Sequence, residues 1–305
     1  MPPEDDAVDD LASHVSDATL IRRAEPMSKR TTLRVGGPAD LYVEPASDQD
    51  LAAVLSFCRH RGRPFFVLGR GSNLLVRDGG FRGVIVCLAQ GHFSRIELEG
   101  RRLRCGAGAK LKAVAVEARR NALAGLEFLE GIPGSVGGAL RMNAGAMGSA
   151  MFEILESVRL MDFTGQIQER TAGELHAAYR SCPALKTHIA LQAVLRGETG
   201  SPQAIEQRMT EYSQKRWKSQ PAAPSAGCVF KNPGSISAGK LIDELGLKGA
   251  RVGGAVVSSE HGNFIVNDGT ATAHDVLALI EVVQQRARLE RGIELETEVE
   301  IIGDQ

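Results

Sequence analysis

The sequence has 305 residues, of which 43% are hydrophobic and 24% charged, and its formal net charge is -1. This length fits two or three domains with sizeable cores, and the composition excludes disordered, collagen-like and membrane-spanning classes. The near-zero charge provides no global basic field, so nucleic acid is not an expected partner. The five cysteines are scattered, odd in number and form no CxxC pair, which argues against a disulfide framework and against a metal site.

The N-terminal residues are acidic and polar, and they lack the hydrophobic core of a signal peptide. We therefore expect residues 1–19 to form a loose tail and the protein to reside in the cytoplasm. A glycine turn at residues 36–37 then leads into a strand. Ser47 is placed to cap a helix that extends to about Arg61.

A short apolar strand over residues 64–69 runs directly into the segment GRGSN at residues 69–73. Two glycines, a hydroxyl and a carboxamide at a strand end can cradle a phosphate through backbone N–H groups. A tight turn between two elements explains the same residues, and from this loop alone the two interpretations have equal weight. The segment is a poor dinucleotide-fold fingerprint, because Leu74 occupies its sixth position and no long helix follows.

Residues 96–99 and 102–105 alternate across a turn and predict a β-hairpin, which a helix over about residues 110–122 follows. The next stretch, residues 125–146, is the densest glycine region of the chain. So many positions without Cβ are costly in chain entropy, which favours a close approach of the backbone to a large ligand. A flexible linker is the alternative, and the interleaved apolar residues argue against it.

The second half of the chain begins with predicted strands within residues 153–197, and Pro202 opens a charged helix that extends to about Lys218. The segment PSAGCVFKNP at residues 224–233 then places a thiol, an ammonium group and a carboxamide in one short loop flanked by prolines. Its glycine precedes the cysteine directly, so the backbone can pass close to something flat or bulky.

Beyond this loop, residues 238–245 predict a helix closed by Gly246, and residues 253–267 read as strand, loop and strand. A capping pattern at Thr272 starts a helix that Gly292 ends. The chain finishes with an alternating segment, residues 293–302, which predicts a strand. The glutamates of this strand share one face, and a solvated outer face is the simplest interpretation of that pattern.

Taken together, these segments resemble one family closely, the UDP-N-acetylenolpyruvoylglucosamine reductases of bacterial cell-wall synthesis. The resemblance covers nearly everything from about residue 28 to 303, in the family's order. Its segments are GRGSN at 69–73, GIPGSVGG at 131–138, MNAGA at 142–146, Tyr179-Arg180, PSAGCVFKNP at 224–233, His261 with NFIVN at 263–267, and LETEV at 295–299. The short span between Arg180 and Cys228 resembles the shorter type of this family, which lacks a tyrosine-loop insertion.

The resemblance implies an α+β fold with a two-subdomain FAD-binding region of the vanillyl-alcohol-oxidase (PCMH) type at residues 20–200. The subdomains would cover about residues 20–88 and 89–200, and an α/β substrate-binding domain would cover residues 201–305. The implied activity uses NADPH to reduce FAD, after which a hydride passes to UDP-N-acetylenolpyruvoylglucosamine and gives UDP-N-acetylmuramate for peptidoglycan. We expect a monomer, with this nucleotide sugar and NADPH as its partners.

The implied reaction adds a hydride to the β-carbon of an enol ether, which leaves negative charge on the α-carbon and its carboxylate. It therefore needs electrostatic stabilisation and a proton donor. The resemblance assigns these roles to Arg180, Cys228 and Glu298. A guanidinium carries a permanent charge and a fork of donors that suits a carboxylate. Glu298 would act protonated, which requires burial, whereas the isolated sequence favours a solvated glutamate.

Position 228 departs from most of the family, which has serine there as the proton donor. A thiol has an unperturbed pKa of about 8.5, well below that of an alcohol, and is intrinsically the easier donor. A cation such as Arg180 or Lys231 nearby could instead leave a thiolate, which cannot donate a proton. We expect Cys228 to be the donor, and Cys58, Cys87 and Cys105 to be core residues.

The resemblance also implies two sets of binding residues. The FAD-binding set is Gly69, Arg70, Gly71, Ser72, Asn73, Gly131, Gly134, Ser135, Gly137, Gly138 and Asn143. The substrate-binding set is Tyr179, Lys231, Asn232 and His261. For His261, an ordinary loop histidine is an equally weighted interpretation.

Two other functions remain as alternatives. One is another flavin oxidoreductase of the same fold that acts on a sugar or a lactone, and the loop around Cys228 and the LETEV segment argue against it. The other is a non-catalytic protein that binds a nucleotide sugar. The presence of Arg180, Cys228 and Glu298 argues against that loss of activity.

Overall fold

The computed structural model describes residues 4–234 and 236–304. The chain divides into two compact units. Unit 1 comprises Met1–Arg23, Leu41–Arg70 and Gly83–Lys215, and unit 2 comprises Ala24–Asp40, Gly71–Arg82 and Arg216–Gln305. Both units are therefore discontinuous in sequence, whereas the sequence analysis placed continuous regions at residues 20–200 and 201–305. The difference arises because two short N-terminal segments pack with the C-terminal part of the chain.

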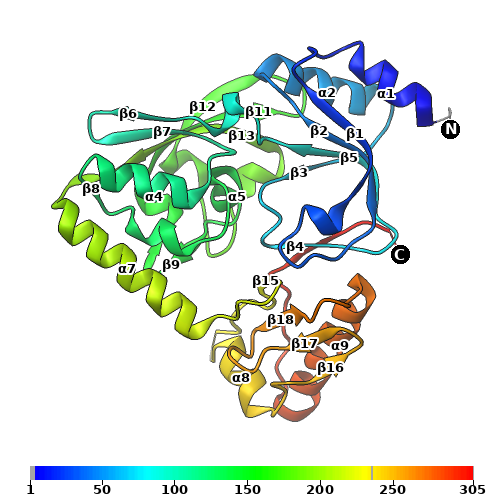
Figure 1. The fold of residues 1–305 in the computed structure, drawn as a ribbon, viewed down its shortest axis with the longest axis vertical. Helices are drawn as coiled ribbons and strands as arrows, with labels where there is room; N and C mark the ends of the chain where they lie inside the picture. Colours follow the sequence, from blue (N-terminus) through cyan, green and yellow to red (C-terminus); the bar gives the residue numbers. More distant parts are fainter. Residues whose placement is uncertain (1–3, 235, 305) are drawn as a thin grey trace. The chain divides into compact units, whose positions relative to one another are not determined.

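The first sheet has four strands in the order β1-β2-β5-β3, with β3 and β5 parallel (Figure 1). Its strands are β1 (Leu20–Pro26), β2 (Pro38–Glu44), β5 (Phe81–Cys87) and β3 (Phe65–Leu68). Helix α2 (Asp48–His60) begins where Ser47 Oγ accepts the Asp50 N–H at 3.1 Å, as the sequence predicts. Its apolar residues Leu51, Val54 and Leu55 are buried in the core of unit 1.

The N-terminal segment is more ordered than the sequence suggested. Residues Glu4–Ala12 form helix α1, in which Leu11 is fully buried and Ala7 is 8% exposed. The Ser16 N–H and Oγ donate to the Asp50 carboxylate at 2.8 and 2.9 Å. The expected loose tail over residues 1–19 is therefore wrong for the described residues, and residues 1–3 lie outside them. Apolar side chains spaced four apart pack on the core despite the acidic composition.

The second sheet, entirely antiparallel, has the order β12-β11-β13-β7-β6. Its strands are β12 (Ile167–Thr171), β11 (Leu155–Asp162), β13 (His188–Arg196), β7 (Arg102–Gly106) and β6 (Ile96–Glu99), so the predicted hairpin over residues 96–105 is confirmed. Helices α4 (Leu111–Arg120) and α5 (Val136–Arg141) pack against β7 and β13. The glycine-rich stretch thus contains a helix and packed turns rather than a flexible linker.

Short elements complete unit 1 and the connection that follows it. These are α3 (Gly91–Ser94), α6 (Met151–Ile154), β8 (Leu123–Ala124) with β14 (Glu198–Thr199), β9 (Gly145–Ala146) with β10 (Ser149–Ala150), and the charged helix α7 (Pro202–Ser219). In the part of the chain that the structure describes, no helix is long and apolar enough to cross a membrane.

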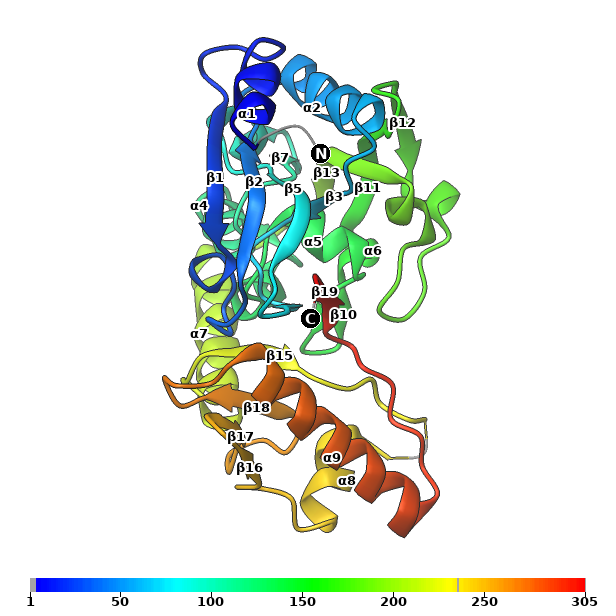
Figure 2. The ribbon, with the colours of Figure 1, turned by 90° about the vertical axis from the view of Figure 1, so that its right-hand side faces the viewer.

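Unit 2 contains an antiparallel sheet of order β15-β18-β17-β16, against which helix α9 packs (Figure 2). The elements are β15 (Ser225–Cys228), β18 (Phe264–Asn267), β17 (Ala255–Val257), β16 (Arg251–Val252), α8 (Ala238–Glu244) and α9 (Ala273–Arg291). The predicted capping box at Thr272 and Asp275 and the left-handed Gly292 cap of α9 are confirmed. A parallel pair, β4 (Leu74–Val76) and β19 (Glu300–Ile302), also belongs to this unit.

The last segment differs from the single strand predicted over residues 293–302. Regular pairing is confined to β19, and an isolated bridge joins Phe230 to Thr297. Between these two places the N–H groups of Glu298 and Val299 both donate to the Val229 carbonyl, at 2.7 and 3.4 Å. This doubled contact resembles a β-bulge, which interrupts regular alternation. The apolar alternation over residues 293–302 is present in the sequence, but regular strand pairing covers only residues 300–302.

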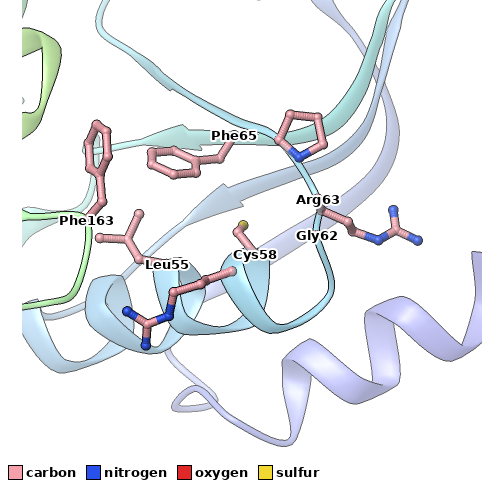
Figure 3. A pocket seen from close by; sticks show the side chains of 8 residues that line it. Leu55, Cys58, Gly62, Arg63, Phe65 and Phe163 are labelled. Atoms are coloured by element: carbon pink, nitrogen blue, oxygen red, sulfur yellow. The ribbon is translucent and has the colours of Figure 1, made fainter.

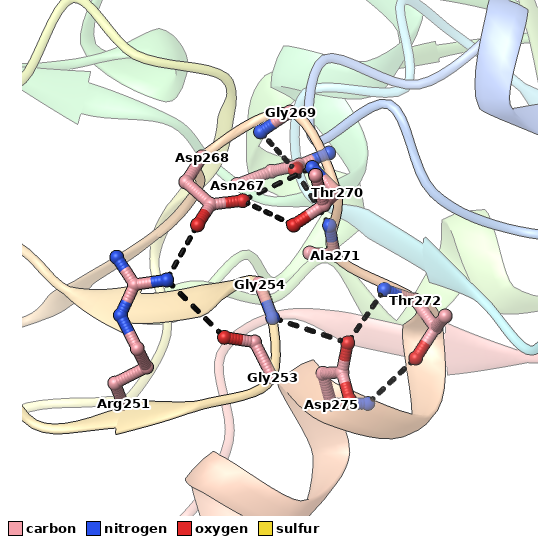
Figure 4. Close-up of polar contacts among 10 residues, drawn as sticks. All are labelled: Arg251, Gly253, Gly254, Asn267, Asp268, Gly269, Thr270, Ala271, Thr272 and Asp275. Carbon is pink, nitrogen blue, oxygen red and sulfur yellow. Dashed lines mark hydrogen bonds and ion pairs between the residues drawn. The ribbon is translucent and has the colours of Figure 1, made fainter.

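A polar cluster organises the turn before α9 (Figure 4). Arg251 pairs with Asp268, whose Oδ1 also accepts the Thr270 hydroxyl at 2.7 Å. A Cβ added at Gly253 would lie 2.3 Å from Asp275 Oδ1, and its φ is +51°, so only glycine fits there. From the loop after β4, Asp78 accepts the N–H groups of Ala273 and His274 at 2.9 and 2.8 Å. These contacts fix the start of α9.

Candidate active site

The loop that carries Cys228 is tied to the neighbouring strand in unit 2. Cys228 pairs with Phe264 across β15 and β18, and its side chain is half-buried. The buried Asn263 side chain brackets the backbone of Phe230, because Oδ1 accepts its N–H at 2.9 Å and Nδ2 donates to its carbonyl at 2.8 Å. The Val229 N–H also donates to the Asn263 carbonyl at 2.9 Å. The residues that follow the thiol are therefore held rigidly.

Glu298 lies beside this loop through its backbone. Its N–H donates to the Val229 carbonyl at 2.7 Å, and its own carbonyl accepts from Asn73 Nδ2 at 3.0 Å. The Glu298 side chain is half-buried, whereas Glu294 and Glu296 are exposed, so it differs from the solvated face expected of these glutamates. The structure thus brings the segments that carry Cys228, Glu298 and Asn73 together. Sequence reasoning predicted Asn73 as an FAD ligand and missed its contact with the Glu298 peptide.

The predicted substrate-binding residues of unit 2 have protein partners. Lys231 Nζ lies 2.9 Å from Glu296 Oε2, and Asn232 Oδ1 accepts the Ala238 N–H at 3.0 Å, where α8 begins. The His261 ring takes part in a hydrogen bond between its Nδ1 and the Asn263 N–H at 3.2 Å. Burial lowers the pKa of His261 below its ordinary value, which favours the neutral ring. These contacts support the interpretation of His261 as a loop histidine.

In unit 1, several of the predicted flavin-binding residues meet at one place. A Cβ added at Gly69 would lie 2.9 Å from Ser135 Oγ, so these two segments approach closely only because residue 69 is glycine. Ser135 is buried and caps α5, with its Oγ accepting the Gly138 N–H at 3.5 Å. At Gly131, a Cβ would meet no described atom within 4 Å beyond its chain neighbours. Close packing at Gly69 and open space at Gly131 therefore occur within the predicted flavin-binding segments.

Other glycines of the predicted set are explained by packing. A Cβ at Gly71 would lie 2.2 Å from the Arg30 carbonyl oxygen, and its φ is +62°. A Cβ at Gly137 would lie 3.1 Å from Ala107 Cβ, and the Gly137 N–H donates to the Ala107 carbonyl at 2.8 Å. The Gly134 carbonyl accepts the Leu111 N–H at 3.1 Å. These glycines shape the segment, a role that the sequence does not distinguish from contact with a ligand.

Arg180 sits in a tight turn of unit 1. Ala178 and Ser181 pair across it, with N–H to carbonyl distances of 2.8 and 3.2 Å. Arg180 has a φ of +55°, which is uncommon for a residue with a Cβ, and such strain concentrates at functional sites. The Tyr179 ring is 62% exposed, and the Arg180 guanidinium lies 5.3 Å from its centroid. The turn therefore presents an aromatic ring and a permanent cation together.

The side chain of Asn143 reaches this turn. Its Nδ2 donates to the Ala178 carbonyl at 3.2 Å, and its Oδ1 accepts the Phe152 N–H at 3.2 Å. The sequence analysis predicted an FAD ligand at this position, but these contacts are to protein backbone. Of the remaining predicted residues, Arg70 is exposed and Ser72 is half-buried.

A cavity of about 430 Å³ lies elsewhere in unit 1 (Figure 3). Its walls include Leu55, Cys58, Phe65 and Phe163, and the two phenylalanine rings meet edge to face with centroids 5.0 Å apart. None of the predicted site residues is among the described residues that line it. Burial raises the pKa of the Cys58 thiol to about 12, so this thiol is a protonated core residue rather than a reactive one.

Comparison with known proteins identifies two domains in the chain. Residues 39–171 match an FAD binding domain, and residues 220–302 match the C-terminal domain of UDP-N-acetylenolpyruvoylglucosamine reductase. These ranges include the glycine-rich segments in the first case and Cys228 and Glu298 in the second. The predicted fold, an FAD-binding region followed by a substrate domain of this type, is confirmed.

Whole-chain relatives agree with this assignment. The chain is 48% identical over 283 residues to a protein from Heliobacterium modesticaldum, covering 92% of this chain and 90% of the relative. It is 44% identical to one from Pelobacter propionicus, covering 94% and 97%. Both relatives are named UDP-N-acetylenolpyruvoylglucosamine reductase.

A solved structure supports the same family assignment at the level of the fold. The crystal structure of UDP-N-acetylenolpyruvylglucosamine reductase (MurB) from Thermus caldophilus matches with a TM-score of 0.79 and 40% identity, covering 93% of this chain and 98% of that one. Identity of this extent over nearly the whole length leaves one conclusion. The chain belongs to the UDP-N-acetylenolpyruvoylglucosamine reductase family.

Proposed function

We propose that this protein catalyses the NADPH-dependent reduction of UDP-N-acetylenolpyruvoylglucosamine to UDP-N-acetylmuramate, a step in the synthesis of peptidoglycan precursors. The observation that carries the proposal is the backbone pairing in unit 2. There the Glu298 N–H donates to the Val229 carbonyl at 2.7 Å, directly beside Cys228. A thiol and a carboxyl mounted on adjoining backbone are the groups that proton delivery needs. Relatives at 44–48% identity that carry the name of this reductase support the assignment.

FAD, when bound, would supply the hydride chemistry between NADPH and the enolpyruvyl group. The residues that we propose to hold it come from the two glycine-containing segments at residues 69–72 and 131–138. The proposed set is Gly69, Arg70, Gly71, Ser72, Gly131, Gly134, Ser135, Gly137 and Gly138. At the glycines of this set, the lack of a side chain gives a phosphate or a ring edge access to the peptide backbone.

Three residues carry the chemistry of the substrate in this proposal. Arg180 pairs with the carboxylate, whose negative charge grows as the hydride reaches the β-carbon. Cys228 donates its thiol proton to the α-carbon, and the resulting thiolate regains a proton from solvent. Glu298, in its protonated form, hydrogen-bonds the developing enolate and limits the charge there. Tyr179, Lys231 and Asn232 are the proposed contacts for the remainder of the nucleotide sugar.

An anaerobic flavin experiment tests this function. The purified protein is expected to be yellow, to lose its flavin absorbance on addition of NADPH, and to regain it on addition of the enolpyruvyl nucleotide sugar. Recovery with a simple sugar or a lactone instead would favour another flavin oxidoreductase. A protein that neither retains nor rebinds FAD would contradict both assignments and leave a nucleotide-sugar binder.

We infer further that the protein acts as a monomer in the cytoplasm. NADPH and the nucleotide sugar are both multiply charged. The free energy needed to move such charges into lipid is large, so both compounds stay in an aqueous compartment. Among the described residues, exposed large apolar side chains such as Leu98 on β6, Trp217 on α7 and Leu289 on α9 come from different elements. Single exposed apolar residues are usual on monomers. Light scattering on a size-exclusion column tests this state, and a mass of twice 32.6 kDa would contradict it.

A further inference from the structure

We propose that Asn143 is a positioning residue that holds the turn carrying Arg180, and that it does not ligate FAD. The inference rests on the proposed reductase function, because it concerns how Arg180 is presented to the substrate. Its basis is the pair of contacts that the Asn143 carboxamide makes with backbone on either side of it, to Ala178 and to Phe152.

The backbone at Asn143 suits this task. The residue follows the C-terminal end of α5 with a φ of +39°, a left-handed conformation in which asparagine is several-fold enriched. This conformation turns the chain away from the helix axis, and the Ala144 N–H donates back to the Ala139 carbonyl at 2.8 Å. The side chain can then bridge two separate segments, the Ala178 carbonyl at 3.2 Å and the Phe152 N–H at 3.2 Å.

The turn itself depends on outside support. Arg180 also adopts a positive φ, +55°, although it carries a long side chain. Conformations of this kind persist where surrounding contacts determine them. The Ala178 carbonyl accepts two hydrogen bonds, one from the Ser181 N–H at 3.2 Å and one from Asn143 Nδ2, which together use both of its lone pairs. Asn143 therefore contacts the residue at which the turn closes.

A second contact fastens the other side of the turn to the same helix end. The N–H of the buried Cys182 donates to the Arg141 carbonyl at 3.0 Å. The Arg141 guanidinium donates in turn to the Leu185 carbonyl at 2.8 Å. The segments before and after Arg180 are thus both joined to the end of α5. Since α5 is part of the glycine-rich segment proposed to hold FAD, one element would position both the cofactor and the cation.

Two substitutions separate this role from cofactor binding. Asn143→Asp keeps the acceptor for Phe152 and tolerates the left-handed conformation, but its carboxylate repels the Ala178 carbonyl. Asn143→Gly keeps the backbone conformation without strain and removes the carboxamide. Asn121→Asp is a matched control for the same local repulsion away from the turn, because Asn121 is also half-buried and its Nδ2 donates to the backbone carbonyl and to Oε1 of Glu117, both at 2.9 Å.

The positioning role predicts a specific pattern of effects. Both Asn143 variants should bind FAD with the wild-type dissociation constant and should be bleached by NADPH at the wild-type rate. Recovery of the flavin absorbance with the enolpyruvyl nucleotide sugar should slow by about tenfold to a hundredfold, since small misplacements of a catalytic group have effects of this size. Trypsin should cleave after Arg180 faster in both variants, with and without FAD, while Asn121→Asp resembles the wild type in every assay.

Two results would overturn the inference. One is weaker FAD binding by both variants with unchanged tryptic cleavage after Arg180, which would make Asn143 a cofactor ligand. The other is an unchanged rate of reoxidation together with unchanged cleavage. Failure of the proposed function is recognised separately, because the wild-type protein would then not be reoxidised by the nucleotide sugar, whereas faster cleavage of the variants would still show that Asn143 holds the turn. A melting curve for each variant confirms that it is folded.

Discussion

The five cysteines of this protein occupy two distinct environments. Cys58, Cys87, Cys105 and Cys182 are buried, which confirms the core role predicted for the first three, whereas Cys228 is half-buried at the end of β15. Burial raises the pKa of the Cys58 and Cys105 thiols to about 12, so they remain protonated at neutral pH. Reactivity of a thiol requires both access and ionisation, and these buried residues lack both.

Alkylation of the native protein checks this difference. Iodoacetamide at pH 8 is expected to label Cys228 first, because the other thiols are shielded from solvent. Peptide mass spectrometry locates the label, and the same reaction in guanidinium chloride should label all five cysteines. Labelling of Cys58 or Cys105 in the native protein as fast as Cys228 would contradict the burial described above.

Replacement of the carboxyl group tests the role proposed for Glu298. Glu298→Gln keeps the backbone contacts with Val229 and Asn73 but cannot share an acidic proton with the enolate. Turnover should fall by about 10²–10³-fold, the usual effect of weakening one donor to a developing negative charge, while bleaching by NADPH stays unchanged. Glu294→Gln, at an exposed glutamate of the same segment, is the control for charge alone and should have a much smaller effect. Equal losses in both variants would count against the assignment.

How far the site could be predicted depends on the kind of residue. Cys228 and Glu298 were named from local motifs, and the structure places their segments side by side in unit 2. The asparagines were harder, because Asn73 and Asn143 stand in glycine-rich motifs but their carboxamides contact the backbone of residues far away in sequence. For Asn263, the sequence indicated only membership of the NFIVN motif, and not the hydrogen bonds of its side chain to the Phe230 backbone. A long-range partner is set by the fold and leaves no trace in local spacing.

At the scale of elements, the turn between β18 and α9 depends on charge. The Thr270 hydroxyl and the Arg251 guanidinium hold the pKa of Asp268 at about 2, well below its ordinary value. The unfolded chain binds this proton near the normal pKa of about 3.9, so ionised Asp268 stabilises the folded state above that pH. The stabilisation is lost as the pH falls from about 4 towards 2.

Asp268→Asn makes that contribution measurable. The variant should be less stable than the wild type at pH 7 and at pH 5, by the same amount, because the wild-type carboxylate is ionised in both states over that range. Below about pH 4 the two stabilities should converge, since the unfolded carboxylate becomes protonated and the native advantage shrinks. Urea denaturation at a series of pH values gives the difference, and a constant difference down to pH 3 would refute the assignment.

Helix α1 provides a second test at this scale, since it was expected to be a loose tail. Leu11→Ala removes a fully buried side chain and should lower the free energy of unfolding by about 2–5 kcal/mol. Leu289→Ala, at a position that is 81% exposed on α9, should change it by less than about 0.5 kcal/mol. Denaturant melts of the two variants compare these values. Similar stabilities would mean that α1 does not pack on the core in solution.

Elements with clear end signals were predicted well, and those without them were not. The N-cap residues of helices α2, α8 and α9 are Ser47, Ser237 and Thr272, whose side chains accept backbone N–H groups, and glycine follows the ends of α8 and α9. Helix α1 was not predicted, because the segment is mainly acidic and only two of its apolar residues are buried in the core. The last strand was overextended because the apolar alternation continues through Glu298 and Val299, where both N–H groups donate to the Val229 carbonyl and regular pairing is interrupted.

For the whole molecule, the division of the chain could not be read from the sequence. Unit 2 combines residues 24–40 and 71–82 with the C-terminal part, and contacts such as Asn267 Nδ2 to the Leu33 carbonyl at 3.1 Å join these distant segments. Thr32 adds to them, because its hydroxyl donates to the Ser225 carbonyl at 2.6 Å. Family resemblance indicated the activity that we propose for the chain, whereas the boundaries of its units required coordinates.

We propose that this FAD-dependent reductase delivers its proton from Cys228. Stopped-flow absorbance of the flavin, after anaerobic reduction with NADPH, measures the following reaction with the enolpyruvyl nucleotide sugar alone. Cys228→Ala should be reduced by NADPH normally but reoxidised by the nucleotide sugar at least about a hundredfold more slowly, and Cys228→Ser should retain substantial activity. Reoxidation of Cys228→Ala at the wild-type rate would contradict the account.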